Sequence, residues 1–125
     1  MTKASGTYRV LVDRSRGLVV VELSGFFFSV DGLAGYLSER TSAIARLGRA
    51  PDGHVILYDL SACPPQSGEV LDFLRHSIEH AALRPRRLAI VAGSALGRLQ
   101  FERLADGPQA RCFDVRKEAL AWLST

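Results

Sequence analysis

Two apolar runs, Val55–Leu60 and Leu88–Ala92, constrain the fold of this chain more than any other feature of its sequence. A strand with one wet face alternates apolar and polar residues, whereas a strand that helices cover on both faces of a parallel sheet is apolar along its length. Between the two runs, apolar residues recur at helical spacing from Leu71 to Ala81. We therefore expect a βαβ unit with a right-handed crossover and with both strands inside a sheet.

Further strands and helices are expected on both sides of this unit. Tyr8–Asp13 and Leu18–Ser24 are rich in β-branched residues, and the short loop between them ends in Gly17, which predicts an antiparallel hairpin. The remaining predicted elements are a helix capped by Ser29 and ended by Gly48 and Pro51, a helix capped by Ser67, a helix capped by Ser94 that carries Leu96, Leu99 and Leu104, a strand over Ala110–Phe113 and a helix capped by Asp114. The order β-β-α-β-α-β-α-β-α predicts an α/β fold with a single mixed, mostly parallel sheet flanked by helices.

The length and composition of the chain fit one globular domain. Its 125 residues are 47% hydrophobic and 23% charged, which is ordinary globular usage. We expect a single domain over residues 1–125, with residues 1–7 as a flexible N-terminal segment. The sequence shows no apolar signal segment and no run that could span a bilayer, and two cysteines are too few for a disulfide framework. We therefore expect a cytoplasmic protein with reduced thiols.

The charge pattern argues against a nucleic-acid partner. The formal net charge is +3, but the sixteen Lys and Arg residues are spread along the chain among thirteen acids. A protein that reads nucleic acid would concentrate them on one element. Arg84, Arg86 and Arg87 come nearest to a cluster. We expect them to form a solvated loop, with phosphate binding as the alternative.

Residues at the ends of the central strands carry a resemblance to a known family. They are Gly25-Phe26 after the second strand, Tyr58-Asp59-Leu60-Ser61 before the helix capped by Ser67, Ala89-Ile90-Val91 before Gly93-Ser94-Ala95, and Phe113-Asp114 before the last helix. This arrangement resembles the SpoIIAA-like branch of the STAS superfamily, whose domains occur in sulfate transporters and anti-sigma factor antagonists. The resemblance implies a non-enzymatic module that binds a regulatory protein partner.

Ser67 is the candidate phospho-acceptor that the resemblance implies. In phosphorylation-switched members of the family, a serine beside an aspartate at the start of the second helix accepts phosphate; here Gln66 replaces the aspartate. A serine that only caps a helix stabilises it by about 1 kcal/mol, and a phosphoserine would place a dianion at the positive end of the same helix. The cap is our first interpretation, and a phosphorylation-switched antagonist is the alternative.

Asp59 and Ser61 end the first apolar strand, where open α/β sheets bind their ligands. We expect the loop from Ser61 to Gly68 and the helix starts at Ser67 and Ser94 to form the recognition surface. The Asp59 carboxylate is expected to accept hydrogen bonds from Ser61 and the following loop. The alternative is a small enzyme that uses Asp59 as an acid or base with Cys63 as nucleophile.

Phe26, Phe27 and Phe28 form the one aromatic run. Because successive strand residues alternate faces, at least one of these rings should point away from the main core. Core packing is the first expectation. The alternatives are a pocket for a small apolar, lipid-like ligand or a contact between two protomers of a homodimer. The lipid alternative rests on the likeness of STAS architecture to lipid-carrying Sec14-like domains.

His76 and His80 match a zinc-binding spacing, since His76-Ser77-Ile78-Glu79-His80 has the form H-x-x-E-H. Both residues fall on the polar side of their predicted helix, and a catalytic zinc site needs a third ligand. We therefore expect two solvated histidines, no metal and no cofactor.

Overall fold

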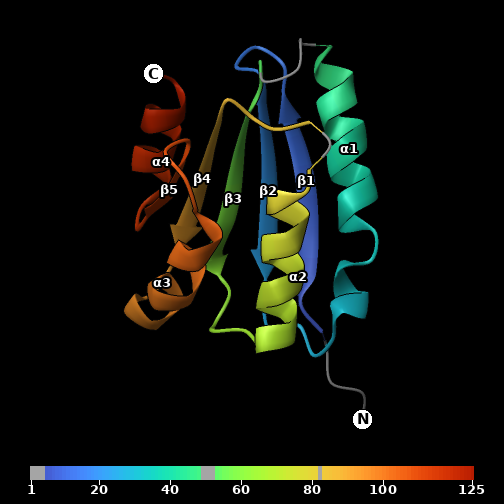
Figure 1. Cartoon of the computed structure of the whole chain (residues 1–125), viewed down its shortest axis with the longest axis vertical. Coiled ribbons are helices and arrows are strands. Elements are labelled where there is room, and N and C mark those ends of the chain that lie inside the picture. The colour runs from blue at the N-terminus through green and yellow to red at the C-terminus, as the bar shows by residue number, and fades with distance from the viewer. Residues whose placement is uncertain (1–4, 49–52, 82) are drawn as a thin grey trace.

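The computed structural model describes residues 5–48, 53–81 and 83–125, and it shows the predicted α/β fold (Figure 1). The strands are β1 (Thr7–Asp13), β2 (Leu18–Ser24), β3 (Val55–Ala62), β4 (Arg87–Ala92) and β5 (Ala110–Phe113), and the helices are α1 (Tyr36–Leu47), α2 (Gly68–Glu79), α3 (Ala95–Phe101) and α4 (Arg116–Leu123), with short 3-10 helices η1 (Val30–Leu33) and η2 (Glu102–Leu104). The strands form one sheet in the order β1-β2-β3-β4-β5. β1 is antiparallel to β2, and all other neighbouring pairs are parallel.

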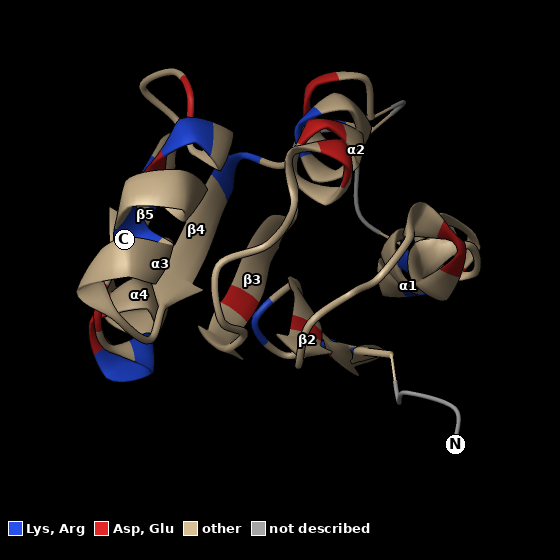
Figure 2. Cartoon of the chain, turned by 90° about the horizontal axis from the view of Figure 1, so that it is seen from below, with Lys and Arg blue, Asp and Glu red and all other residues tan. Residues whose placement is uncertain are grey.

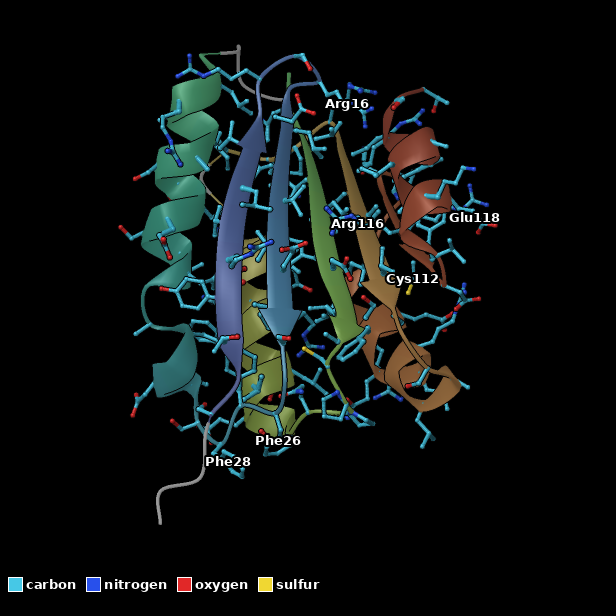
Figure 3. All side chains as sticks on the ribbon, turned by 180° about the vertical axis from the view of Figure 1, so that it is seen from behind. Arg16, Phe26, Phe28, Cys112, Arg116 and Glu118 are labelled. Atoms are coloured by element: carbon cyan, nitrogen blue, oxygen red, sulfur yellow. The ribbon has the colours of Figure 1, made fainter. Side chains whose placement is uncertain are left out.

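The strand order explains which helices cover which face of the sheet. From β2 to β5 the chain adds each strand on the same side of the last, so right-handed crossovers place the connecting helices α1, α2 and α3 on one face. α4 follows the last strand and packs on the opposite face, against β3, β4 and β5. Within the described residues, no helix covers the outer side of β1, as the view from behind shows (Figure 3).

Each face of the sheet has its own apolar core. The inner core, under α1, α2 and α3, includes Val19, Val21, Ile56, Ile90, Leu74 and Phe101. The outer core, under α4, includes Leu18, Val20, Leu57, Val91, Ala119 and Leu123. β3 and β4 contribute to both cores, which is why their sequences are apolar throughout. No helix within the described ranges is long and apolar enough to cross a membrane.

A buried polar cluster ties α1 and α2 to β3 inside the inner core. The Tyr58 hydroxyl lies 2.6 Å from the Tyr36 hydroxyl, which in turn lies 2.7 Å from Ser77 Oγ. Arg40 Nη1 donates to Tyr58 at 2.9 Å and to the Ser77 carbonyl at 2.9 Å. Burial raises the pKa of Tyr58 well above its ordinary value, so the phenol stays neutral. The acceptors of Arg40 Nη1 in this cluster are hydroxyl and carbonyl oxygens.

Replacing Tyr58 by phenylalanine removes the hydroxyl that bonds both Tyr36 and Arg40 in this cluster. We expect a loss of about 1–3 kcal/mol of unfolding free energy, because Tyr36 and Arg40 each lose a buried partner. Urea denaturation measures the change. The matched control is Tyr8→Phe, on a half-exposed ring of β1, which should cause a much smaller change. Equal effects of the two substitutions would contradict the role of the cluster.

The helix predicted to begin at Ser29 is two elements. Ser29 caps η1, with its Oγ accepting from Asp31 N at 3.3 Å, and α1 begins at Tyr36 after Gly35. A side chain at Gly35 would overlap the Tyr8 hydroxyl, so the chain passes close to β1 there before it turns into α1. The predicted end at Gly48 is confirmed, with a left-handed φ of 62°. Pro51 lies outside the described residues.

One other expectation needs correction. Asp114 does not cap α4, whose N-cap is Val115; its carboxylate instead pairs with Arg98 at 2.8 Å and holds α3 to the loop before α4. Of the three leucines predicted on the helix capped by Ser94, Leu104 is buried, whereas Leu96 and Leu99 are 67% and 66% exposed. Of the N-terminal segment, residues 1–4 lie outside the described ranges, while Gly6 N donates to the Phe26 carbonyl and β1 begins at residue 7.

Candidate functional site

Two loops and helix α3 meet at the carboxyl ends of the parallel strands, and Gln66, whose side chain is buried, joins them. Its Oε1 accepts from Phe27 N at 2.9 Å, and its Nε2 donates to the carbonyls of Gly25 and Pro64 at 3.0 and 2.8 Å. The Gln66 backbone is held by Gln100 of α3, which accepts from its N–H at 2.7 Å and donates to its carbonyl at 2.9 Å. The β2–η1 loop, the β3–α2 loop and α3 therefore form one connected unit.

Gly93 makes the close approach of β3 and β4 at this end possible. Its hydrogen faces the backbone of Ser61, and a Cβ built there would lie 2.9 Å from the Ser61 carbonyl carbon and closer still to its oxygen. Any side chain at this position must push the ends of the two strands apart. Because Ser61 leads into the loop of Gln66 and Gly93 into α3, this contact sets how those segments lie relative to each other.

Ser67 and Ser94 cap the helices that begin at this end, as expected. Ser67 Oγ accepts from Val70 N at 3.3 Å, and Ser94 Oγ accepts from Gly97 N at 3.0 Å. Both serines are exposed. Ser67 follows Gln66 directly, so its hydroxyl lies on the surface that the two loops and α3 build.

The phenylalanine run divides between core and surface. Phe27 is 1% exposed and packs in the inner core, whereas Phe28 is 53% exposed. The Phe26 and Phe28 rings pack edge to face, with centroids 5.0 Å apart, at the same end of the molecule (Figure 3). Core packing thus accounts for one ring of the three. A lipid-like pocket and a dimer contact at the other two remain untested predictions.

We name the exposed side chains around Gln66 the carboxyl-end surface: Phe28, Ser67, Ser94, Leu96 and Leu99. Leu96 and Leu99 lie one turn apart on α3, which Gln100 attaches to the loop of Ser67. Single exposed apolar side chains are common, but neighbouring ones that form a patch can mark a surface that binds other molecules; Leu96 and Leu99 are 67% and 66% exposed.

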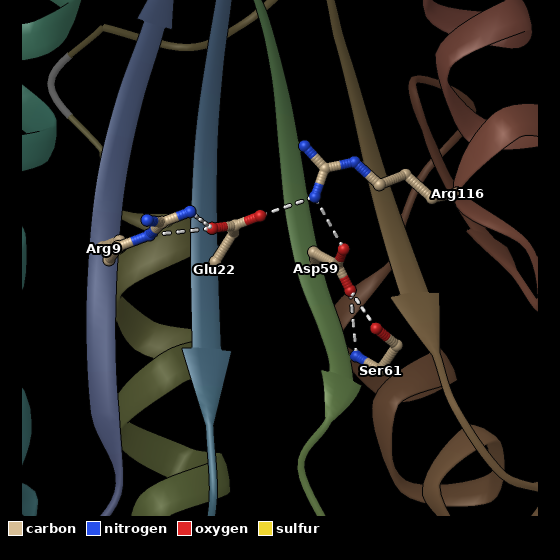
Figure 4. A network of polar contacts seen from close by, with 5 residues as sticks. All are labelled: Arg9, Glu22, Asp59, Ser61 and Arg116. Atoms are coloured by element: carbon tan, nitrogen blue, oxygen red, sulfur yellow. Dashed lines mark hydrogen bonds and ion pairs between the residues drawn. The ribbon is translucent and has the colours of Figure 1, made fainter.

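A charged network crosses the outer side of the sheet and involves Asp59 (Figure 4). Arg116 of α4 donates to Glu22 at 2.6 Å and to Asp59 at 2.9 Å. Arg9 donates to Glu22 at 2.7 Å. The second oxygen of Asp59 accepts from the Ser61 N–H at 3.0 Å and from its hydroxyl at 2.6 Å, which are the bonds expected from the sequence.

This network stabilises the fold rather than preparing a catalytic base. A cavity of about 340 Å³ reaches Asp59 and Ser61, but both oxygens of Asp59 already accept hydrogen bonds. Hydrogen bonds from Arg116 and then Arg9 lower the pKa of Glu22. A carboxyl whose pKa is lowered by folding stabilises the protein above its unfolded pKa, and this contribution is lost as the pH falls.

Cys63 is a poor candidate nucleophile. Burial, with a smaller effect of the Asp59 charge, raises the pKa of its thiol to about 12, so the thiolate is scarce at neutral pH. Cys63 and Asp59 are therefore not prepared as nucleophile and base.

His76 and His80 lie on the exposed side of α2, with ring centroids 4.2 Å apart. Within the described ranges, no group of three or more histidine, cysteine or acidic side chains is arranged to hold a metal ion.

Sequence reasoning missed the residues that assemble the site. It interpreted Gln66 only as the replacement of an acid, and it did not consider Gln100 or Arg116. A buried glutamine between a Pro-Pro pair and a helix cap is a weak signal, because its partners lie 34 to 41 residues away. The exposure of Leu96 and Leu99 could have been predicted from the spacing of Gly97 and Phe101, which form the buried side of α3.

Comparison with known proteins places the fold among SpoIIAA-like structures. An uncharacterised DUF3478-family protein with a SpoIIAA-like fold from Shewanella loihica PV-4 superposes with a TM-score of 0.70 at 21% identity, over 98% of both chains. An anti-sigma factor antagonist from Mycobacterium paratuberculosis superposes with a TM-score of 0.68 at 20% identity, over 97% of this chain and 96% of that one. No protein-family model and no curated protein sequence matches the chain. The resemblance expected from the sequence is confirmed at the level of the fold.

Proposed function

We propose that this protein is a STAS-type regulatory module that binds a protein partner through its carboxyl-end surface and performs no catalysis. The observation that carries the proposal is the set of Gln66 hydrogen bonds, which fixes three separate segments into one surface. The fold likeness to an anti-sigma factor antagonist supports an anti-sigma factor as the partner. The raised pKa of the Cys63 thiol supports a binding role over an enzymatic one.

A protein is a better occupant of this surface than a small molecule. Leu96 and Leu99 project from α3 and are 67% and 66% exposed, so they offer apolar anchors to a matching surface. Apolar anchors surrounded by polar groups are typical of protein interfaces. Here Ser67 and Ser94 supply exposed polar side chains at the starts of α2 and α3.

Phosphorylation of Ser67 is the second candidate, as a control of the same interaction. The hydroxyl is exposed at the first turn of a 12-residue helix, where the helix dipole favours a dianion. Gln66 brings no negative charge next to it, and its side chain is occupied by other bonds. A phosphate at Ser67 would place two negative charges on the surface that we propose the partner contacts.

Site-specific photo-crosslinking in the source cells tests the proposal. A benzophenone amino acid at position 96 should capture one protein, whereas the same amino acid at position 11 should not. Leu11 is a matched control, because it is 39% exposed on the uncovered side of β1. Capture of the same proteins from both positions, or from neither, would contradict the proposed surface. Mass spectrometry of the captured complex shows whether Ser67 is modified.

A further inference from the structure

A cavity of about 560 Å³ lies at the opposite end of the sheet from the carboxyl-end surface. It is bordered by the end of α2, the loop before β4 and the loop that precedes β5, at the end of the molecule where β4 begins (Figure 1). Leu88 and Ala110 are paired across β4 and β5 and line it, together with Ile78 and Pro85. The volume falls within the range of small-molecule sites, which is about 300–1,000 Å³.

Two arginines give the mouth of this cavity a positive charge. Arg84 and Arg86 both line it, and neither forms an ion pair with a described carboxylate; their Nη2 atoms donate to the carbonyls of Glu79 and Leu123, at 2.7 and 3.3 Å. By contrast, Arg98 and Arg116 each pair with two acids. The bond to Glu79 holds Arg84 at the mouth and leaves its other N–H groups for a ligand. Figure 2 shows basic segments at the start of β4, close to α2.

Asp106 and Gln109 complete the wall on the side of β5. Asp106 is exposed, so one acid stands against the two arginines. The cavity therefore combines an apolar floor with a net positive mouth.

We infer that this cavity binds a small amphipathic organic anion, with the apolar part of the ligand on Leu88, Ala110 and Ile78 and its carboxylate on Arg84. A guanidinium forms two parallel hydrogen bonds with a carboxylate, which gives direction to binding. The apolar floor contributes in proportion to the area that the ligand removes from water. This site is independent of the proposed protein interaction, because it lies at the other end of the strands.

Two-dimensional NMR titration with 2-naphthoate tests this inference. We expect saturable shifts of the amides of Leu88, Ala110 and Ile78, and about tenfold weaker binding of the neutral 2-naphthamide. Arg84→Glu should weaken 2-naphthoate binding about tenfold or more and leave 2-naphthamide nearly unaffected. The matched control is Arg103→Glu, on an exposed arginine of η2 that does not line the cavity and should change neither affinity.

The outcomes separate this inference from its competitors. Ala110→Phe fills the floor of the cavity and should abolish the binding of both compounds, while the remaining amide shifts report that the fold is intact. The inference is overturned by an absence of saturable shifts, by shifts centred on Phe26 and Phe28 instead, or by equal effects of the Arg84 and Arg103 substitutions. Each result leaves the crosslinking experiment at position 96 unaffected.

Discussion

Gly93→Ala is expected to destabilise the protein by about 3 kcal/mol, a cost in the range of overpacked sites that cannot relax. The added methyl would lie 2.9 Å from the Ser61 carbonyl carbon and 3.0 Å from its Cα, and closer to the oxygen. These neighbours are backbone atoms at the end of β3, so no side-chain rotation relieves the overlap. The strand ends must separate, and the loop of Gln66 must move with them.

Urea denaturation of this variant has a matched control in Gly68→Ala. A Cβ at Gly68 meets no atom within 4 Å, and the residue begins α2, where alanine is the better helix former. Gly68→Ala should therefore leave stability unchanged or raise it slightly. If the two alanine variants unfold at the same urea concentration, the close approach of β3 and β4 is not as tight as the structure shows.

Gln66→Glu is expected to cost about 3 kcal/mol or more at pH 7, since it buries a negative charge and turns one of its oxygens toward two carbonyl oxygens. The two side chains have the same shape, but the amide donates to the Gly25 and Pro64 carbonyls, and a carboxylate there would face two oxygens. The variant therefore changes the charge and the donor capacity of the side chain without changing its shape. It also places an acid before Ser67, as in the phosphorylation-switched members of the resembled family.

The cost of Gln66→Glu should depend on pH in a defined direction. Burial beside carbonyl oxygens raises the pKa of the new carboxyl above its unfolded value, so the variant is relatively more stable at pH 4 than at pH 7. Gln109→Glu is the control on an exposed glutamine and should change stability by about 0.5 kcal/mol or less at both pH values. A Gln66→Glu protein that is as stable as the wild type at pH 7 would contradict the role of Gln66.

The fold was predictable where local pattern and burial agree. The apolar runs identified β3 and β4, because strands with both faces covered need no polar residues. The caps at Ser67 and Ser94 depend on residues two or three positions ahead, which a sequence shows directly. The expected cap at Asp114 was wrong because its carboxylate pairs with Arg98 of another helix, a contact that the local sequence does not show.

The site was less predictable because its contacts are long-range. Gln66 reaches Gly25, Phe27 and Gln100, and nothing in the local sequence distinguishes such a glutamine from a solvated one. Arg116 likewise reaches Glu22 across 94 positions. Sequence pattern placed the serines at the correct end of the sheet, whereas it did not show that Gly97 and Phe101 form the buried side of α3 and leave Leu96 and Leu99 exposed.

The affinity of the captured partner for surface variants tests the central claim most directly. The double variant Leu96→Asp with Leu99→Asp should weaken binding by about 2 kcal/mol or more, which is at least about 30-fold, because it removes the proposed apolar anchors. Leu11→Asp, on the uncovered side of β1, should leave the affinity unchanged. Calorimetric titration of the partner with the three folded proteins gives these values. Unchanged affinity of the double variant, or equal loss with Leu11→Asp, would contradict the account.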